Sequence, residues 1–246
     1  MGGALARGLL DSGLYNPENI SISEPEQEKL TDLKEMGVKI YTSNTEDLKT
    51  AGLIVIAVKP WVVKDIISEI LLSIDKRKQE LCFIVAGIPS EKLSEMFGEF
   101  IPEKVSIAIP NIAMVKRESM TFMVSVRGKD FEAEKIFNLV GKVLVIEERL
   151  LPAATALASC GIAFAMRYVR ASCEGGVELG FRASQAQEIV VQTLKGVVSL
   201  LSEKGSHPEM EIDKVTTPGG ITIKGLNAME RNGFTNSVIE GLKAAR

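Results

Sequence analysis

Glycines crowd the start of the chain, at positions 2, 3 and 8 of the opening sequence MGGALARG. In dinucleotide-binding folds, glycines at a helix start let a pyrophosphate approach the helix N-terminus, where free N–H groups favour negative charge. A carboxylate about 20 residues further on then binds a ribose hydroxyl, and Glu24 stands at that spacing from Gly2. These residues match the end of a dinucleotide-binding fingerprint. Taken alone, they are explained more simply by a helix that begins with two glycines and an unrelated surface glutamate.

Small or polar residues follow three consecutive apolar runs, as the pairs Lys59-Pro60, Ala86-Gly87 and Pro110-Asn111. Ligands of open α/β sheets bind at the carboxyl ends of the parallel strands. A lysine followed by a helix-starting proline suits such a cofactor edge, and so does a glycine that admits close backbone approach. An ordinary strand-to-helix turn explains each pair by itself, so the prediction depends on all three together.

The segment 216–222 reads TTPGGIT and offers hydroxyls and backbone N–H groups at a predicted helix start. Such a helix N-terminus is a good receptor for a carboxylate, and an ordinary capped helix start is the alternative. His207 is the only histidine and precedes a proline, so we expect a solvated loop residue rather than a catalytic one. A single histidine also excludes a histidine-based zinc site.

The composition excludes several classes of function. The formal net charge is −3, with 29 basic and 32 acidic residues, and aromatic residues make up 5%. The chain therefore lacks the basic field that attracts nucleic acid or an anionic membrane, and it lacks aromatic platforms for stacked bases. Its three cysteines, Cys82, Cys160 and Cys173, have no metal-binding spacing and lie in apolar surroundings. This pattern favours reduced, buried thiols in a cytoplasmic protein.

The first part of the chain alternates short apolar runs with helical stretches, a pattern typical of a parallel sheet covered by helices on both faces. We expect strands at residues 19–23, 53–58, 81–85, 105–109, 120–126 and 142–146. We expect helices at residues 3–12, 26–36, 62–74, 90–97 and 131–140. The fold class is therefore α/β, with a doubly wound parallel sheet in a first domain of residues 1–147.

Strand patterns stop after Glu147, and residues 148–246 are expected to form a second, all-helical domain. The predicted helices are 150–179, 184–202, 222–231 and 235–245. Residues 150–166 carry no charge, but they fall short of the roughly 20 apolar residues that a membrane span needs. We therefore expect a buried helix and no membrane partner. A secretory signal is not expected either, because Arg7 and Asp11 interrupt the N-terminal apolar stretch.

Taken together, these segments resemble the pyrroline-5-carboxylate reductase family, in order and over nearly the whole chain. The matching pieces are residues 1–8, 34–39, 57–60, 86–87, 110–111, 174–180 and 215–222. The last piece, VTTPGGIT, is the most specific. The resemblance implies a Rossmann-like domain followed by a helical dimerisation domain in an intertwined homodimer. It also implies the reduction of 1-pyrroline-5-carboxylate, a cyclic imine acid, to L-proline with NADPH or NADH in proline biosynthesis.

The resemblance also implies roles for individual residues. Those expected at the cofactor are Met1, Gly2, Glu24, Asn44, Val58, Lys59, Pro60, Ala86 and Asn111. Those expected around the substrate are Glu203, Val215, Thr217, Gly219, Gly220 and Ile221. Thr222 is the expected catalytic residue, which hydrogen-bonds the ring nitrogen while hydride reaches the adjacent carbon. Because the difficult chemistry belongs to the cofactor, no metal is expected.

The chain departs from the family pattern at several positions. In the family a strand and a G-x-G-N segment precede the residue that is Met1 here. We therefore expect a sheet without its central strand, and we interpret the start as truncated rather than as a loss of dinucleotide binding. Near the expected nicotinamide site, hydroxyls are lost and backbone freedom is altered at Ile112, Ala113, Pro152, Ala158 and Ile162.

These departures leave two alternatives open. One is a related oxidoreductase that acts on a different imine or keto acid. The other is a non-catalytic dimeric regulator or scaffold that has lost cofactor binding. For an enzyme, Glu24 predicts a preference for NADH, because a carboxylate beside the adenosine ribose repels the 2′-phosphate of NADPH.

Overall fold

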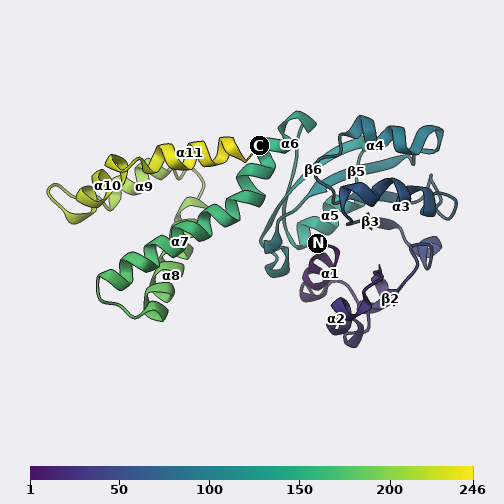
Figure 1. The fold of residues 1–246 in the computed structure, drawn as a ribbon, viewed down its shortest axis with the longest axis horizontal. Helices are drawn as coiled ribbons and strands as arrows, with labels where there is room; N and C mark the ends of the chain where they lie inside the picture. The colour runs from purple at the N-terminus through teal and green to yellow at the C-terminus, as the bar shows by residue number, and fades with distance from the viewer. Residues whose placement is uncertain (246) are drawn as a thin grey trace. The chain divides into compact units, whose positions relative to one another are not determined.

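The computed structural model describes residues 1–245, and the chain divides into two compact units, between Thr155 and Ala156 (Figure 1). Every strand that the structure describes lies in the first unit, and the second unit is helical. The α/β fold class and the all-helical second part are therefore confirmed. The domain boundary after residue 147 stays a prediction.

Five strands form the main sheet of the first unit: β3 (Leu53–Ile56), β4 (Glu80–Phe83), β5 (Lys104–Ile109), β6 (Ser119–Arg127) and β7 (Gly141–Val145). They lie side by side in chain order, and β3, β4 and β5 are parallel. β6 runs antiparallel to β5 and parallel to β7. Both β6 and β7 therefore run opposite to β3, β4 and β5, and the prediction of an all-parallel sheet is wrong from β6 onward. The reason is the connection, because residues 110–118 are too short for the crossover of about a dozen residues or more that a parallel neighbour needs.

Four helices flank this sheet: α1 (Gly2–Asp11), α3 (Val63–Ile70), α4 (Ser90–Phe97) and α5 (Glu132–Leu139). They cover both faces because successive side chains of a strand point to opposite faces. Leu81 and Phe83 of β4 share a core with α3 and α4. Cys82 and Ile84 face the other way, into a core with α1 and α5. The apolar run 81–85 is thus buried on both faces, as the sequence predicts.

A separate two-stranded parallel sheet is formed by β1 (Ser21–Ser23) and β2 (Lys39–Tyr41). The sequence did not predict β2, because three residues are too few for an alternating pattern. The short helix α2 (Thr31–Glu35) follows β1. A small core joins these elements to α1, through Ala6, Leu30, Leu33 and Val38. Within residues 1–245, β1 pairs only with β2, and β3 pairs only with β4.

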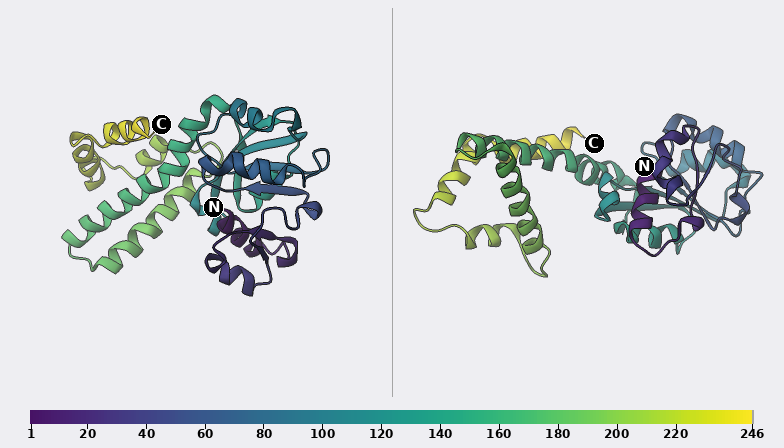
Figure 2. Two further views of the ribbon diagram at one scale, coloured as in Figure 1. Left: turned by 45° about the vertical axis from the view of Figure 1, so that its right-hand side comes forward. Right: turned by 90° about the horizontal axis from the view of Figure 1, so that it is seen from below.

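The second unit contains α7 (Gly161–Glu178), α8 (Ala183–Leu201), α9 (Pro208–Lys214), α10 (Ile221–Arg231) and α11 (Phe234–Ala244). α7 and α8 lie side by side (Figure 2), so close that a Cβ built on Gly176 would be 3.0 Å from the Cβ of Ala186. The sequence did not predict α9. His207 is an exposed residue of the loop before α9, as expected, and it is the N-cap of that helix. Its Nδ1 accepts a hydrogen bond of 3.3 Å from the N–H of Glu209.

The predicted helix 150–179 is interrupted. The short α6 (Leu151–Ala154) leads into a π-helical turn, Thr155–Cys160, before α7 begins. The expectation that residues 150–166 are buried is wrong for the single chain, since Leu157 is 65% exposed and Met166 is 60% exposed. By length and composition, the stretch Glu148–Glu178 could cross a membrane, but one such helix is weak evidence.

Candidate active site

The N-terminus of α1 has the character of an anion-binding site. Met1 is the N-cap, no side chain caps the helix, and its first turn contains no acidic residue. The start of α4 differs, because the N–H of Ser90 donates to the Glu148 carboxylate at 2.6 Å. The start of α5 is likewise occupied by the buried carboxylate of Glu80, which accepts from the N–H of Ala133 at 2.9 Å. Among the described residues, the start of α1 therefore has no carboxylate partner like those of α4 and α5, and its helix dipole favours an anion there.

The fold brings this helix end together with the residues that follow β3. A Cβ built on Gly2 would lie 3.5 Å from the Cβ of Ala57, so Met1 and Gly2 are neighbours of the segment that contains Val58, Lys59 and Pro60. Lys59 and Pro60 are exposed and Val58 is half-buried. The Lys59 ammonium therefore adds a mobile positive charge at the edge where α1 begins.

Ala86 and Asn111 follow β4 and β5, which are parallel to β3, so they lie at the same edge of the sheet. Ala86 is exposed, and a Cβ built on the adjacent Gly87, which has φ +81°, would meet no atom within 4 Å. Asn111 is buried and firmly held. Its N–H donates to Ser119 Oγ at 3.1 Å, and its Oδ1 accepts from the N–H of Ala113 at 3.0 Å.

Glu24 and Asn44 mark the ends of β1 and β2. The N–H of Glu24 donates to the Tyr41 carbonyl at 3.0 Å, and its Oε1 accepts from the N–H of Glu26 at 3.1 Å. The Asn44 Nδ2 donates to Glu69 Oε2 of α3 at 2.9 Å. Because strands β1 and β2 are parallel, both residues leave the small sheet on one side.

An open pocket of about 740 Å³, with two glutamates in its lining, lies directly after Glu24. Its lining is Pro25, Glu26, Gln27, Glu28, Lys29 and Thr42. The one cation in this lining is Lys29, whose ammonium is 2.7 Å from Glu26 Oε1. This hydrogen bond to Glu26 raises the pKa of Lys29. The spacing in the sequence pointed to Glu24, whose role stays a prediction, and gave no sign of the neighbouring Glu26 and Glu28.

The loop 217–222, the expected substrate loop, is built around the start of α10. Gly219 has φ +70°, a conformation that favours glycine. The N–H of Gly220 donates to the Thr217 carbonyl at 3.0 Å, and a Cβ on Gly220 would come within 2.6 Å of Thr217 Oγ1. Gly220 is the N-cap of α10, with no side-chain cap and no acidic residue in the first turn. This helix start is therefore also free to receive an anion.

The structure places the remaining substrate candidates around or beyond this loop. Val215 and Ile221 are 64% and 87% exposed, and Thr222 is exposed in the first turn of α10. Glu203 lies between α8 and α9, and within residues 1–245 its carboxylate makes no hydrogen bond to the loop. Residues 217–222 thus form one mostly exposed loop and helix start, and the structure gives no hydrogen bond from the Glu203 carboxylate to them within residues 1–245.

None of the three cysteines offers a nucleophile at the carboxyl ends of β3, β4 and β5. Cys82 is fully buried between the two helix layers, and burial raises its pKa to about 12. Cys160 and Cys173 are half-buried, so the expectation of buried thiols is wrong for these two in the single chain.

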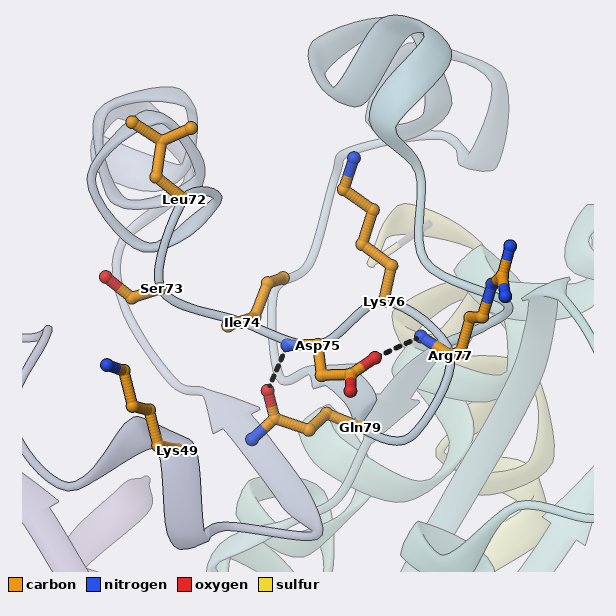
Figure 3. Close-up of a pocket in the computed structure, with 8 residues that line it drawn as sticks. All are labelled: Lys49, Leu72, Ser73, Ile74, Asp75, Lys76, Arg77 and Gln79. Carbon is orange, nitrogen blue, oxygen red and sulfur yellow. Dashed lines mark hydrogen bonds between the residues drawn. The ribbon is translucent and has the colours of Figure 1, made fainter.

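A second pocket, of about 560 Å³, lies at the opposite end of β4 (Figure 3). Its lining is Lys49, Leu72, Ser73, Ile74, Asp75, Lys76, Arg77 and Gln79. The Asp75 N–H donates to Gln79 Oε1 at 2.7 Å, and the Lys76 ammonium lies 3.9 Å from the centroid of the Phe100 ring. Figure 3 shows the side chains of Lys49, Lys76 and Arg77 pointing away from one another. These cations therefore do not converge on a ligand.

The donors at the α1 edge fit a dinucleotide. An uncapped helix start suits a pyrophosphate, the exposed Lys59 suits its charge, and the open space beside Gly87 admits a flat group. Within residues 1–245, no group of three or more candidate metal ligands is present.

Two family sequence models match the chain. One is described as pyrroline-5-carboxylate reductase dimerisation and matches residues 148–246. The other is described as NADP oxidoreductase coenzyme F420-dependent and matches residues 1–87.

Related proteins and structures cover the whole chain. Pyrroline-5-carboxylate reductases 1 and 2 of Dictyostelium discoideum are 35% and 34% identical over 98% of this chain, which spans 46% of the first and 86% of the second. Reductase 3 of Mus musculus is 31% identical over 100% of this chain and 90% of its own length. The crystal structure of Plasmodium falciparum pyrroline carboxylate reductase with NADP bound has a TM-score of 0.83 and 27% identity, covering 98% of this chain and 90% of that one. The chain belongs to the pyrroline-5-carboxylate reductase family.

Proposed function

We propose that this protein reduces 1-pyrroline-5-carboxylate to L-proline with a nicotinamide dinucleotide, in proline biosynthesis. The observation that carries the proposal is similarity to reductases of this name over the whole chain, which includes both the α1 edge and the loop 217–222. The open helix start of α1 beside Ala57 supports it from the geometry.

Residues of the first unit hold the cofactor. Met1 and Gly2 offer the helix N-terminus to the pyrophosphate, and Lys59 adds a positive charge. Val58, Pro60 and Ala86 line the dinucleotide further along, and Asn111 stands at the nicotinamide end. The hydrogen bonds of Asn111 to Ser119 and Ala113 fix its position before a ligand arrives. When bound, the reduced nicotinamide supplies the hydride.

Residues of the second unit orient the substrate. Thr217, Gly219, Gly220 and Ile221 present hydroxyl and N–H donors to its carboxylate at the start of α10, with Val215 and Glu203 at the periphery. The Thr222 hydroxyl donates to the ring nitrogen. As the imine carbon accepts hydride, the nitrogen gains electron density and a proton, so a donor at this atom stabilises the product side of the reaction.

The acidic end of β1 supports a preference for NADH over NADPH. Glu24, Glu26 and Glu28 gather here, and the nearby Lys29 is already paired with Glu26. A 2′-phosphate would meet carboxylates without a free cation to neutralise it. Asn44, held by Glu69, offers a neutral amide on the same adenosine side.

The exposed apolar surface of α7 and α8 supports a homo-oligomer. Met166 of α7 and Val198 and Leu200 of α8 are all at least 49% exposed in the single chain, and the matching family model is described as a dimerisation domain. A second copy of the chain covers this surface in the proposed homodimer. We propose a cytoplasmic location, with neither nucleic acid nor membrane as a partner.

The test is oxidation of NADH, followed by absorbance, with synthetic 1-pyrroline-5-carboxylate and the full-length protein. Formation of L-proline supports the proposal. NADH binding without proline formation, together with turnover of another cyclic imine or a keto acid, favours the related oxidoreductase. A dimer that binds neither NADH nor NADPH favours the scaffold, and either of these results contradicts the proposed reaction.

A further inference from the structure

The only tryptophan of the chain stands exposed at the edge that α1 and β3 share. Trp61 is 75% exposed and lies in the short 3₁₀ turn Pro60–Val62, directly after Lys59. Within residues 1–245 its side chain takes part in no hydrogen bond or ring contact. A large aromatic side chain left in water loses the stabilisation that burial would give. The indole directly follows Lys59 and Pro60, which we assign to the cofactor, so a dinucleotide bound there would lie beside it.

The backbone around Trp61 is fixed. The N–H of Val62 donates to the Lys59 carbonyl at 3.1 Å. Val63, two residues further on, is 0% exposed in the core beneath α3. The turn therefore holds the indole outward, on a rigid base next to the carboxyl end of β3.

A contact of α3 links the turn that contains Trp61 to Asn44, the residue that we assign to the adenosine half of the cofactor. Asn44, which follows β2, donates to Glu69 of α3 at 2.9 Å, and α3 begins two residues after Trp61. The helix that follows Trp61 is thus tied to the loop that contains Asn44. A flat ring bound between the ends of β2 and β3 would have Trp61 as its exposed aromatic neighbour.

We infer that the Trp61 indole is a stacking platform for the adenine ring of the dinucleotide, a role that rests on the proposed function. Purine rings stack on aromatic side chains because each presents a flat π-face that is poorly solvated. Trp61 then contributes to cofactor affinity without touching the reacting atoms, so it is a positioning residue.

Fluorescence of the full-length protein tests this, because all tryptophan emission comes from Trp61. ADP-ribose, which carries adenine without nicotinamide, is expected to quench the emission, whereas oxidised nicotinamide mononucleotide, which lacks adenine, is not. By calorimetry, Trp61→Ala should weaken ADP-ribose and NADH binding about tenfold and leave mononucleotide binding unchanged. Trp61→Phe, which keeps a smaller ring, should stay within about threefold of wild type.

A matched control is Leu72→Ala, which removes a 95% exposed side chain just beyond the other end of α3. It should change none of these affinities. Wild-type affinity of Trp61→Ala for ADP-ribose overturns the inference, and so does an equal loss for the mononucleotide. If a second copy of the chain covers Trp61 instead, Trp61→Ala changes the oligomer mass and ADP-ribose leaves the emission unaltered, which also overturns it. A wild-type protein that binds NADH and fails to reduce the imine contradicts the proposed reaction alone.

Discussion

A Cβ built on Gly8 would lie 2.6 Å from the carbonyl oxygen of Met114. The same Cβ would lie 2.8 Å from Cγ1 of the buried Val140. Helix α1 therefore rests directly on the backbone of the segment that follows β5. This contact fixes the helix whose N-terminus we assign to the pyrophosphate.

Gly8→Ala is expected to destabilise the protein by about 1–3 kcal/mol, because the methyl group overpacks a backbone that cannot move aside easily. In an open helical position the same change gains about 0.4–1 kcal/mol. Gly196 in α8 is such a position, since nothing lies within 4 Å of its Cβ. The midpoints of urea unfolding of Gly8→Ala and Gly196→Ala test this difference. An unchanged or raised midpoint for Gly8→Ala contradicts the packing described.

Glu80→Gln tests the buried cap of α5. Glu80 is 3% exposed, and its two carboxylate oxygens accept the N–H groups of Glu132 at 2.6 Å and of Ala133 at 2.9 Å. An amide supplies one acceptor and places an NH₂ group against the remaining N–H, which should cost about 1–3 kcal/mol. Thermal melting should show a clear decrease, whereas Glu103→Gln should leave the melting temperature nearly unchanged.

Asp47 makes stability depend on pH. Hydrogen bonds from Ser21 and Thr50 lower its pKa below the ordinary value of 3.8. Because the pKa of Asp47 is lower in the folded protein than in the unfolded chain, its hydrogen bonds stabilise the fold fully at pH values above the unfolded-state pKa. This stabilisation is lost as the pH falls through the folded-state pKa. Asp47→Asn should therefore flatten the decline of melting temperature below about pH 4. Asp11→Asn is the control, and an equal flattening by both variants would argue against a specific role for Asp47.

Glu24→Gln tests the basis of cofactor choice. Removing the carboxylate at the end of β1, next to this pocket, should lower the Michaelis constant for NADPH and raise that for NADH. Steady-state kinetics with both cofactors gives the ratio of the two Michaelis constants. Lys29→Gln is a companion variant that removes the one cation in the pocket lining. A wild-type protein that already prefers NADPH would refute the hypothesis.

Thr222→Val removes the proposed donor to the ring nitrogen and keeps the side-chain shape. We expect kcat to fall about 100-fold or more, with little change in NADH affinity. Thr222→Ser restores a hydroxyl and should recover most of the rate. If the valine variant retains wild-type kcat, Thr222 has no part in the chemical step.

Local patterns in the sequence were sufficient for much of the fold. The apolar run 81–85 predicts a strand covered on both faces, and the structure places Phe83 and Cys82 in opposite cores. The predicted helix 90–97 agrees with α4 in both of its bounds. Each of these elements depends on neighbouring residues, whose spacing the sequence displays directly.

Other features depend on contacts between distant parts of the chain. The sequence contains no sign that Asn44 is held by Glu69, or that Glu148 occupies the start of α4. The π-helical turn Thr155–Cys160 breaks a stretch that the sequence predicts as one continuous helix. Such details follow from packing, which overrides local preference.

The sequence by itself determined that a glycine-rich helix start, three strand ends and the TTPGGIT loop exist, because turns and helix caps need particular residues at particular positions. Only the tertiary structure decided which of them meet. It set Gly2 against Ala57, left the N-terminus of α1 free while carboxylates occupy those of α4 and α5, and turned Trp61 outward at the same edge. The physical reason is that these relationships arise from close packing between segments far apart in the chain, and packing is a property of the folded whole.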